Sequence, residues 1–201
     1  MKNTVTYMLM IALMYSCSEK PDVLPSGEYI SWTESESSGL INSKTIDDIT
    51  FSVYYLPKEA MALRETGASP SEAEWKSVVE SKGDMQYYKV VYRLANSNQD
   101  ILKYNLYDEN EYFSRTNYLA FGVDKDVYLL SGKDKLPCRM HQFTPHYGIS
   151  PEAEILFAFD EPDKEHEQNK TFVIEDQLFG TGILQFEFTA ENIKNIPSIQ
   201  F

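Results

Sequence analysis

The sequence has little cysteine and little positive charge. Only two cysteines occur in 201 residues, which excludes a scaffold held together by several disulfides. Eighteen Lys and Arg residues stand against 31 Asp and Glu residues, so the formal net charge is −13. A field of that sign repels phosphate backbones, and no stripe of basic residues offsets it. We therefore expect no nucleic acid partner.

Long hydrophobic runs are also missing. The apolar segment at residues 5–14 is interrupted by Thr6 and is too short to cross a bilayer, which takes about 20 residues as a helix. It follows a start that carries Lys2 and precedes Ser16 and Cys17. A basic start, a short apolar core and a small residue before the end are typical of a secretory signal. Removing residues 1–16 takes away Lys2 and no acid, so the net charge moves from −13 to −14.

The end of this leader, Met14-Tyr15-Ser16-Cys17, resembles the lipobox of bacterial lipoproteins, where a Leu, two small residues and a Cys form the processing site. Ser16 and Cys17 match the pattern, and Tyr15 departs from it. The resemblance implies that Cys17 carries acyl chains such as palmitate, and two or three chains hold a protein on a membrane permanently.

The residues after Cys17 indicate which membrane would hold the lipidated protein. Ser18 stands where an Asp tends to retain lipoproteins in the inner membrane, so the resemblance implies the outer membrane. The short charged segment 18–22 is similar to the export tag of Bacteroidetes-type surface lipoproteins, although those tags are richer in acids. Both the periplasmic and the cell-surface side stay open.

The chain does have the composition of a folded domain. Hydrophobic residues make up 42% and aromatic residues 13%, with 14 tyrosines, which favour strands and half-buried surfaces. We expect a signal peptide at residues 1–16, a lipidated Cys and flexible tether at 17–28, and a single β-rich globular domain at 29–201. A domain of that length can bury a substantial core.

The hydrophobic pattern predicts a mainly β fold. Two early segments have the composition and spacing of helices, at residues 57–65 and 71–81. Alternation and turn signals predict strands at 49–56, 85–94, 101–107, 116–123, 127–130, 154–159, 171–174 and 183–188. This order favours an antiparallel β-sandwich or open barrel with one or two short helices near its N-terminal part.

Cys138, His141 and His146 lie within nine residues of one another, and His166 follows. A thiolate and two imidazoles could bind zinc, or Cys138 and a histidine could form a nucleophile pair. The spacing matches no standard zinc pattern, and Pro137 and Pro145 mark an ordered connection between strands. We therefore expect structural histidines, with Cys138 and Phe143 packed inward.

Two acidic clusters, at residues 108–111 and 160–163, fall in predicted loops. Clustered carboxylates at a turn suit Ca²⁺, so Asp108 and Asp160 are its candidate ligands. Neither cluster has the spacing of an EF-hand, and we expect solvated turns without a resident cofactor.

Tyrosines recur along the predicted strands, and Tyr87, Tyr88, Tyr92 and Tyr104 are candidates for a binding face. Tyrosine suits binding surfaces because its ring packs while its hydroxyl stays hydrated. Ordinary sheet packing is the alternative.

No catalytic motif stands out, so we lean against an enzyme. The leading hypothesis is a lipid-anchored extracytoplasmic binding or assembly module that contacts a protein or a glycan. The alternatives are a lipoprotein hydrolase acting on envelope or dietary polymers and an accessory subunit of an envelope machine. A hydrolase predicts a pocket with converging carboxylates or a Cys–His pair, whereas a binding module predicts an aromatic face or groove.

Overall fold

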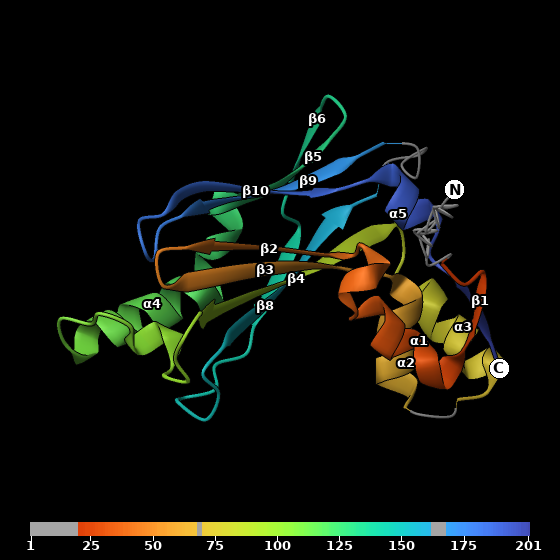
Figure 1. Cartoon of the computed structure of the whole chain (residues 1–201), viewed down its shortest axis with the longest axis horizontal. Coiled ribbons are helices and arrows are strands. Elements are labelled where there is room, and N and C mark those ends of the chain that lie inside the picture. Colours follow the sequence, from red (N-terminus) through yellow and green to blue (C-terminus); the bar gives the residue numbers. More distant parts are fainter. Residues whose placement is uncertain (1–19, 68–69, 162–167) are drawn as a thin grey trace, which may run out of the picture.

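A computed structural model describes residues 20–67, 70–161 and 168–201. The predicted signal at 1–16, Cys17 and His166 lie outside these residues. Two antiparallel sheets pack face to face, with helices gathered at one end of the sandwich and another helix at the opposite end (Figure 1). The predicted mainly β fold is confirmed. Among the described residues both sheets end in edge strands without a further paired strand, so the fold is a sandwich rather than a closed barrel.

The larger sheet has five strands in the order β2-β3-β4-β8-β7. These are β2 (Ile41–Ile46), β3 (Ile49–Leu56), β4 (Met85–Leu94), β8 (Ala153–Asp160) and β7 (Met140–Phe143). Phe51 and Val53 on β3 point inward and alternate with Ser52 and Tyr54. The strict alternation in the sequence fixes this register, because a slip by one residue would turn the apolar set to water.

The smaller sheet has four strands in the order β10-β9-β5-β6. These are β10 (Gly182–Phe188), β9 (Lys170–Asp176), β5 (Val127–Ser131) and β6 (Asp134–Pro137). The amide of Asn42 on β2 donates to the carbonyl of Glu187 on β10 at 3.1 Å, which links the two sheets along one edge.

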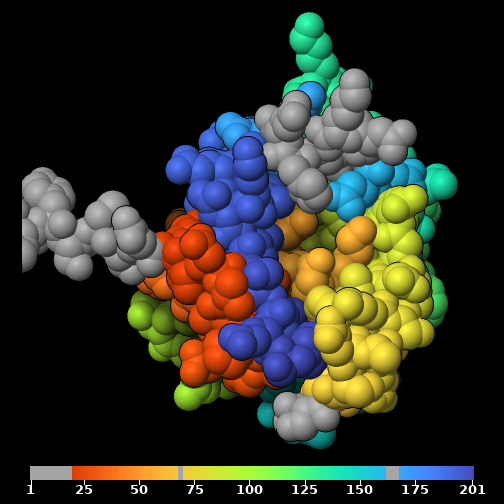
Figure 2. Space-filling model, turned by 90° about the vertical axis from the view of Figure 1, so that its right-hand side faces the viewer, coloured from red at the N-terminus to blue at the C-terminus, as the bar shows by residue number. Residues whose placement is uncertain are grey.

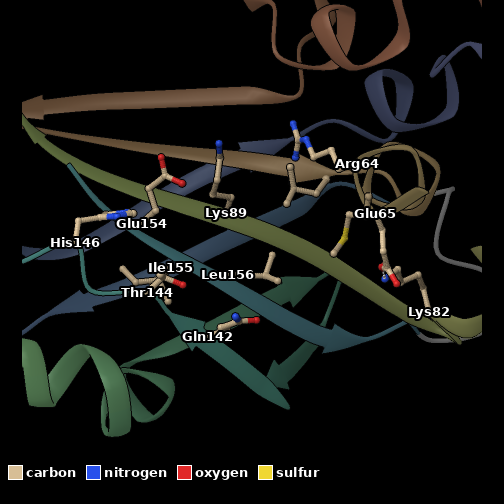
Figure 3. Close-up of a pocket in the computed structure, with 12 residues that line it drawn as sticks. Arg64, Glu65, Lys82, Lys89, Gln142, Thr144, His146, Glu154, Ile155 and Leu156 are labelled. Carbon is tan, nitrogen blue, oxygen red and sulfur yellow. Dashed lines mark hydrogen bonds and ion pairs between the residues drawn. The ribbon is translucent and has the colours of Figure 1, made fainter. Parts of the chain in front are cut away.

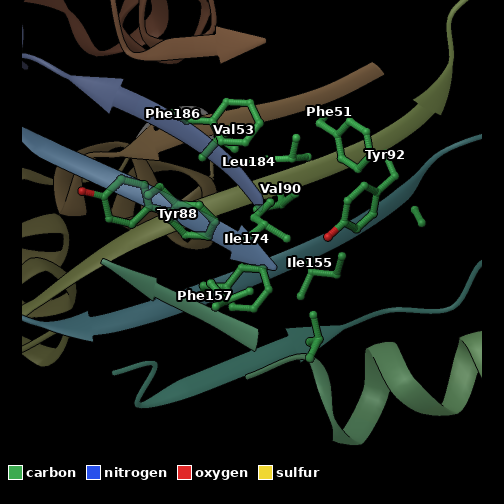
Figure 4. Close-up of a cluster of buried hydrophobic side chains, with 14 of the residues drawn as sticks. Phe51, Val53, Tyr88, Val90, Tyr92, Ile155, Phe157, Ile174, Leu184 and Phe186 are labelled. Atoms are coloured by element: carbon green, nitrogen blue, oxygen red, sulfur yellow. The ribbon is translucent and has the colours of Figure 1, made fainter. Parts of the chain in front are cut away.

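Aromatic side chains fill the space between the sheets (Figure 4). Tyr88 lies at the centre, with its ring 5.2 Å from Phe172 and 5.5 Å from Phe188 of the opposite sheet. Phe51 meets Tyr92 edge to face at 5.3 Å. Such pairs add about 0.5–1.5 kcal/mol each beyond the burial of their area.

One end of the sandwich carries most of the helices, in line with the prediction for residues 57–65 and 71–81. They are α1 (Ser26–Thr33), α2 (Lys58–Thr66), α3 (Glu72–Ser81) and α5 (Ala190–Lys194). Ser71 caps α3 by accepting a hydrogen bond from the Glu74 amide. A parallel pair of β1 (Val23–Pro25) and β11 (Ser198–Gln200) completes this end.

The expected tether at residues 17–28 is wrong for its last part, because residues 23–28 form β1 and the start of α1. Lys20 is already attached to the domain, since its ammonium donates to the Ser38 carbonyl and to Asn192 Oδ1, each at 2.8 Å.

The predicted strands at 101–107 and 116–123 are also wrong. The first segment contains η2 (Ile101–Lys103), and the second belongs mostly to α4 (Glu109–Phe121), which leads into η3 (Val123–Asp126). A further short helix, η1 (Glu36–Ser38), precedes β2. Asp108 caps α4 by accepting from the Glu111 amide, and Glu111 accepts from the Tyr107 amide in return. These hydrogen bonds start α4, which runs on through residues 116–121, where alternation alone suggested a strand.

In the part of the chain described here, no helix has both the length and the apolar character needed to cross a membrane.

Candidate functional site

The segment around Cys138 is a packed connection between strands. Cys138 and Phe143 lie against the sandwich core, as expected. His141 stacks on Phe157, and its Nε2 lies 3.0 Å from the Ala120 carbonyl. His146 lies in the loop after β7. Burial raises the pKa of the Cys138 thiol to about 11, so the thiolate that a nucleophile needs is scarce at neutral pH.

The acidic clusters have structural partners. Asp108 caps α4, and Glu111 pairs with Arg115 at 2.7 Å. The hydrogen bond from the Tyr107 amide, with the help of Arg115, keeps the pKa of the Glu111 carboxyl below its usual value. Asp160 pairs with Arg139 at 3.1 Å, and Glu161 pairs with Lys58. Within residues 20–67, 70–161 and 168–201, no three His, Cys, Asp or Glu side chains form a group that could hold a metal ion.

The four candidate tyrosines do not form a binding face. Tyr88 and Tyr92 lie in the sandwich core, and Tyr87 is buried beneath the helical end, where its hydroxyl donates to the Lys82 carbonyl. Tyr104 is partly exposed and donates to Asp48 at 2.9 Å. The alternative of ordinary sheet packing therefore holds for the three tyrosines of β4.

Two hollows stand out on the described surface. The first, here called the outer-sheet groove, lies on the outer face of the larger sheet beside α2 and encloses about 510 Å³ (Figure 3). Its base is apolar, with Leu56, Met61 and Leu156. Arg64 pairs with Glu34 at 2.6 Å, and Lys82 pairs with Glu65. Because these two cations are already paired with carboxylates, they are less available to bind a charged ligand.

The second hollow, here called the cap groove, lies at the helical end and encloses about 820 Å³. In Figure 2 it opens between α3, in yellow, and the blue segment 193–201, with orange residues that precede and begin α2 at its base. Elements far apart in the sequence form it: α1 contributes Tyr29, α3 contributes Trp75, and the end of the chain contributes Ile199 and Phe201.

An aromatic pair lines the cap groove. The rings of Trp75 and Phe201 lie 5.0 Å apart at an interplanar angle of 55°. The indole N–H of Trp75 donates to the Glu59 carbonyl at 3.2 Å, which fixes the orientation of the ring. Phe201 keeps 45% of its surface exposed, although it is a large apolar residue. The pair therefore offers a preformed apolar surface inside a concave site.

Charges of both signs surround this pair. The lysines are Lys58, Lys76 and Lys194, and the acids include Glu59 and Glu72. Lys76 pairs with Glu72 at 2.6 Å on the exposed side of α3, whereas Lys194 makes no ion pair with any described residue. Such a rim can donate and accept hydrogen bonds at several points around a polar ligand.

Comparisons with known proteins give no evidence on the role of the cap groove. No protein family model matches the chain, and no curated protein or solved structure matches it either. Sequence reasoning missed the cap groove because Trp75 reads as part of the apolar stripe of α3, and Phe201 belongs to no pattern. The local sequence carries no signal that brings α3 and residues 193–201 together.

Proposed function

We propose that this protein is a lipid-anchored extracytoplasmic binding module and that its cap groove binds a short glycan segment. The observation that carries the proposal is the Trp75–Phe201 pair within a hollow of about 820 Å³. Sugar rings present C–H faces that pack on aromatic rings and hydroxyls that bond to charged side chains. The cap groove places aromatic rings and charged side chains next to each other.

The cap groove suits a binding role better than the outer-sheet groove does. The Trp75 ring is held in place before any ligand arrives, since its indole N–H donates to the Glu59 carbonyl. A preorganised surface reduces the entropy that is lost on binding. A glycan is favoured over a purely apolar ligand because lysines and glutamates border the rings.

The binding test uses the full chain carrying Cys17→Ser, so that no acyl group is attached. A glycan array identifies an oligosaccharide, and calorimetry then measures its Kd. We expect Trp75→Ala to weaken binding by at least about tenfold, as removal of a central aromatic contact does. Phe201→Ala should also weaken it, without disturbing the Trp75–Glu59 hydrogen bond. Phe121→Ala, at an exposed phenylalanine on α4, is the control and should leave Kd unchanged.

Two outcomes would overturn the glycan assignment: no array member binds, or both groove variants bind as the parent does. Release of new reducing ends from the bound oligosaccharide would instead support the hydrolase alternative.

The anchor has its own test. Cells that express the full chain should incorporate labelled palmitate into it, and Cys17→Ser should lose the label. Cys138→Ser is the matched control and should keep it. Equal labelling of the Cys17→Ser variant and the parent would refute the lipid anchor, whatever the groove binds.

A further inference from the structure

One side chain at the cap groove lacks the partner that its chemistry requires. Tyr29 of α1 is fully buried and lines the groove. Among the described residues, its hydroxyl is the one buried side-chain polar atom that makes no hydrogen bond. A buried hydroxyl without a partner costs about 1–3 kcal/mol. Such a group beside a concave surface is a candidate contact for a ligand.

Tyr29 lies at the floor of the cap groove. Trp75, Ile196 and Ile199 pack against the cluster of buried residues that contains Tyr29. The same three residues line the groove. They are partly exposed whereas Tyr29 is not, so Tyr29 lies deeper in the groove than they do.

The hydroxyl end of Tyr29 lies on the groove side of the residue. Burial raises the pKa of Tyr29, and the Glu59 carboxylate and Tyr55 raise it further. Electrostatic effects fall off with distance, so both of these groups lie near the hydroxyl. Glu59 and Tyr55 also line the cap groove. The unpartnered hydroxyl and the groove therefore share the same neighbours.

The surroundings of this hydroxyl select the chemistry of a ligand group. An anion would be repelled by the Glu59 carboxylate, and an ammonium would lose its hydration against Ile196 and Ile199. A neutral acceptor that also carries an apolar surface meets neither penalty. An acetamido group has this chemistry, because its carbonyl oxygen accepts a hydrogen bond and its methyl group is apolar.

We propose that Tyr29 donates a hydrogen bond to the carbonyl of an acetamido group, so that the cap groove selects glycans built from N-acetylated amino sugars. This inference rests on the proposed function, since it names the class of glycan that the groove binds. The amide N–H of the same group can donate to the Glu59 carboxylate, and its methyl group can pack against Ile196 and Ile199. Both polar atoms of the acetamido group then have partners.

Binding requires a small movement of side chains in the groove. The Tyr29 hydroxyl exposes almost no surface, whereas Ile196 and Ile199 are partly exposed. Side chains at a surface change rotamer within nanoseconds, so these two can turn aside when the acetamido group enters. The ligand then supplies the hydrogen-bond partner that the protein does not, and it offsets the cost of the buried hydroxyl.

The test measures Kd by calorimetry for two tetrasaccharides and the full chain carrying Cys17→Ser. Chitotetraose and cellotetraose share the same backbone and linkage, but chitotetraose carries an acetamido group on each ring where cellotetraose carries a hydroxyl. We expect chitotetraose to bind at least about tenfold more tightly. Tyr29→Phe should weaken binding of chitotetraose by about three- to tenfold, the effect of one neutral hydrogen bond, and leave cellotetraose unchanged.

Stability and a second tyrosine serve as controls. Tyr29→Phe removes a hydroxyl that has no partner among the described residues, so Tm should not fall. A loss of affinity at unchanged Tm is an effect that a merely structural residue would not produce. Tyr104→Phe is the matched control, because its hydroxyl donates to Asp48 and does not line the groove. It should leave both Kd values unchanged.

The outcomes separate this inference from the proposed function. Equal binding of chitotetraose by Tyr29→Phe and the parent, or equal Kd values for the two tetrasaccharides, would overturn the role of Tyr29. The glycan proposal would still stand if Trp75→Ala weakened binding of either tetrasaccharide. A glycan from the array that binds when chitotetraose does not would have the same meaning. Failure of every glycan to bind would overturn both.

Discussion

The guanidinium of Arg115 donates a hydrogen bond of 2.7 Å to the main-chain carbonyl of Tyr104. It donates a second bond, of 3.2 Å, to the Leu102 carbonyl and pairs with Glu111 at 2.7 Å. Its central carbon lies 5.3 Å from the ring of Phe179, in the turn between β9 and β10. One buried cation thus fastens α4 to the sandwich.

We predict that Arg115→Met destabilises the protein by about 2–4 kcal/mol, because it leaves buried carbonyls and Glu111 without their donor. Arg115→Lys keeps the charge but not the planar guanidinium, so it should lower the free energy of unfolding by less than Arg115→Met does. Urea denaturation followed by circular dichroism measures both. A Met variant as stable as the parent would show that this cation does not hold α4 in place.

The helix α4 also shows where sequence reasoning failed. Leu102, Tyr104 and Leu106 alternate with polar residues and suggested a strand, but Leu102 belongs to η2, and the other two lie in the turn that follows, where Asn105 has a φ of 50°. The informative signal was the pair Asp108 and Glu111, whose spacing is that of a capping box. It was interpreted as a possible calcium loop because carboxylates serve both purposes.

The strand at 49–56 could be predicted from its alternation, and the strand at 85–94 from its content of Tyr and Val, which favour strands; both predictions match the structure to the residue. Tyr87 and Tyr88 must face opposite sides of the sheet, but their sequence does not say which side is the core. The cap groove could not be predicted from the sequence, because Tyr29, Trp75 and Phe201 come together only through tertiary packing.

Tyr29 provides a second prediction. It is fully buried among Ala60 and Leu63, and its hydroxyl has no hydrogen-bond partner among the described residues. Tyr29→Phe removes a polar group that was desolvated without compensation, so the free energy of unfolding should stay the same or rise by up to about 1 kcal/mol. Tyr29→Ala should lower it by about 3–5 kcal/mol through the cavity it leaves.

The same residue responds to pH. Burial raises the pKa of Tyr29 above its usual value, so the folded state keeps a proton that the unfolded state releases above about pH 10. Its contribution to stability is complete below that pH and is lost as the pH rises. Tyr29→Phe should therefore lose stability less steeply than the parent in alkaline titrations of Tm. Identical profiles would contradict a raised pKa.

A substitution at His141 tests whether this histidine has a structural role or binds a metal. Because a carbonyl oxygen can only accept, Nε2 of His141 carries the hydrogen that it shares with the Ala120 carbonyl, and the ring stacks on Phe157. We expect His141→Ala to lower the free energy of unfolding by about 1–3 kcal/mol, equally with and without EDTA. His146→Ala, in the loop, should have an effect within about 0.5 kcal/mol. Stoichiometric zinc, with a Tm that falls in EDTA only while His141 is present, would overturn this interpretation.

The last prediction concerns the thiol of Cys138. Its Sγ lies 3.2 Å from the Met140 carbonyl, and burial raises its pKa to about 11. In the Cys17→Ser chain Cys138 is the remaining cysteine, so alkylation by iodoacetamide reports on it alone. At pH 8 the folded protein should react about a hundredfold more slowly than the chain in concentrated urea, in proportion to the smaller fraction of thiolate. The unfolded state releases this proton first, so stability should fall as the pH rises above about 9. Equal alkylation rates in the two states would show a reactive thiol and return the Cys–His nucleophile to consideration.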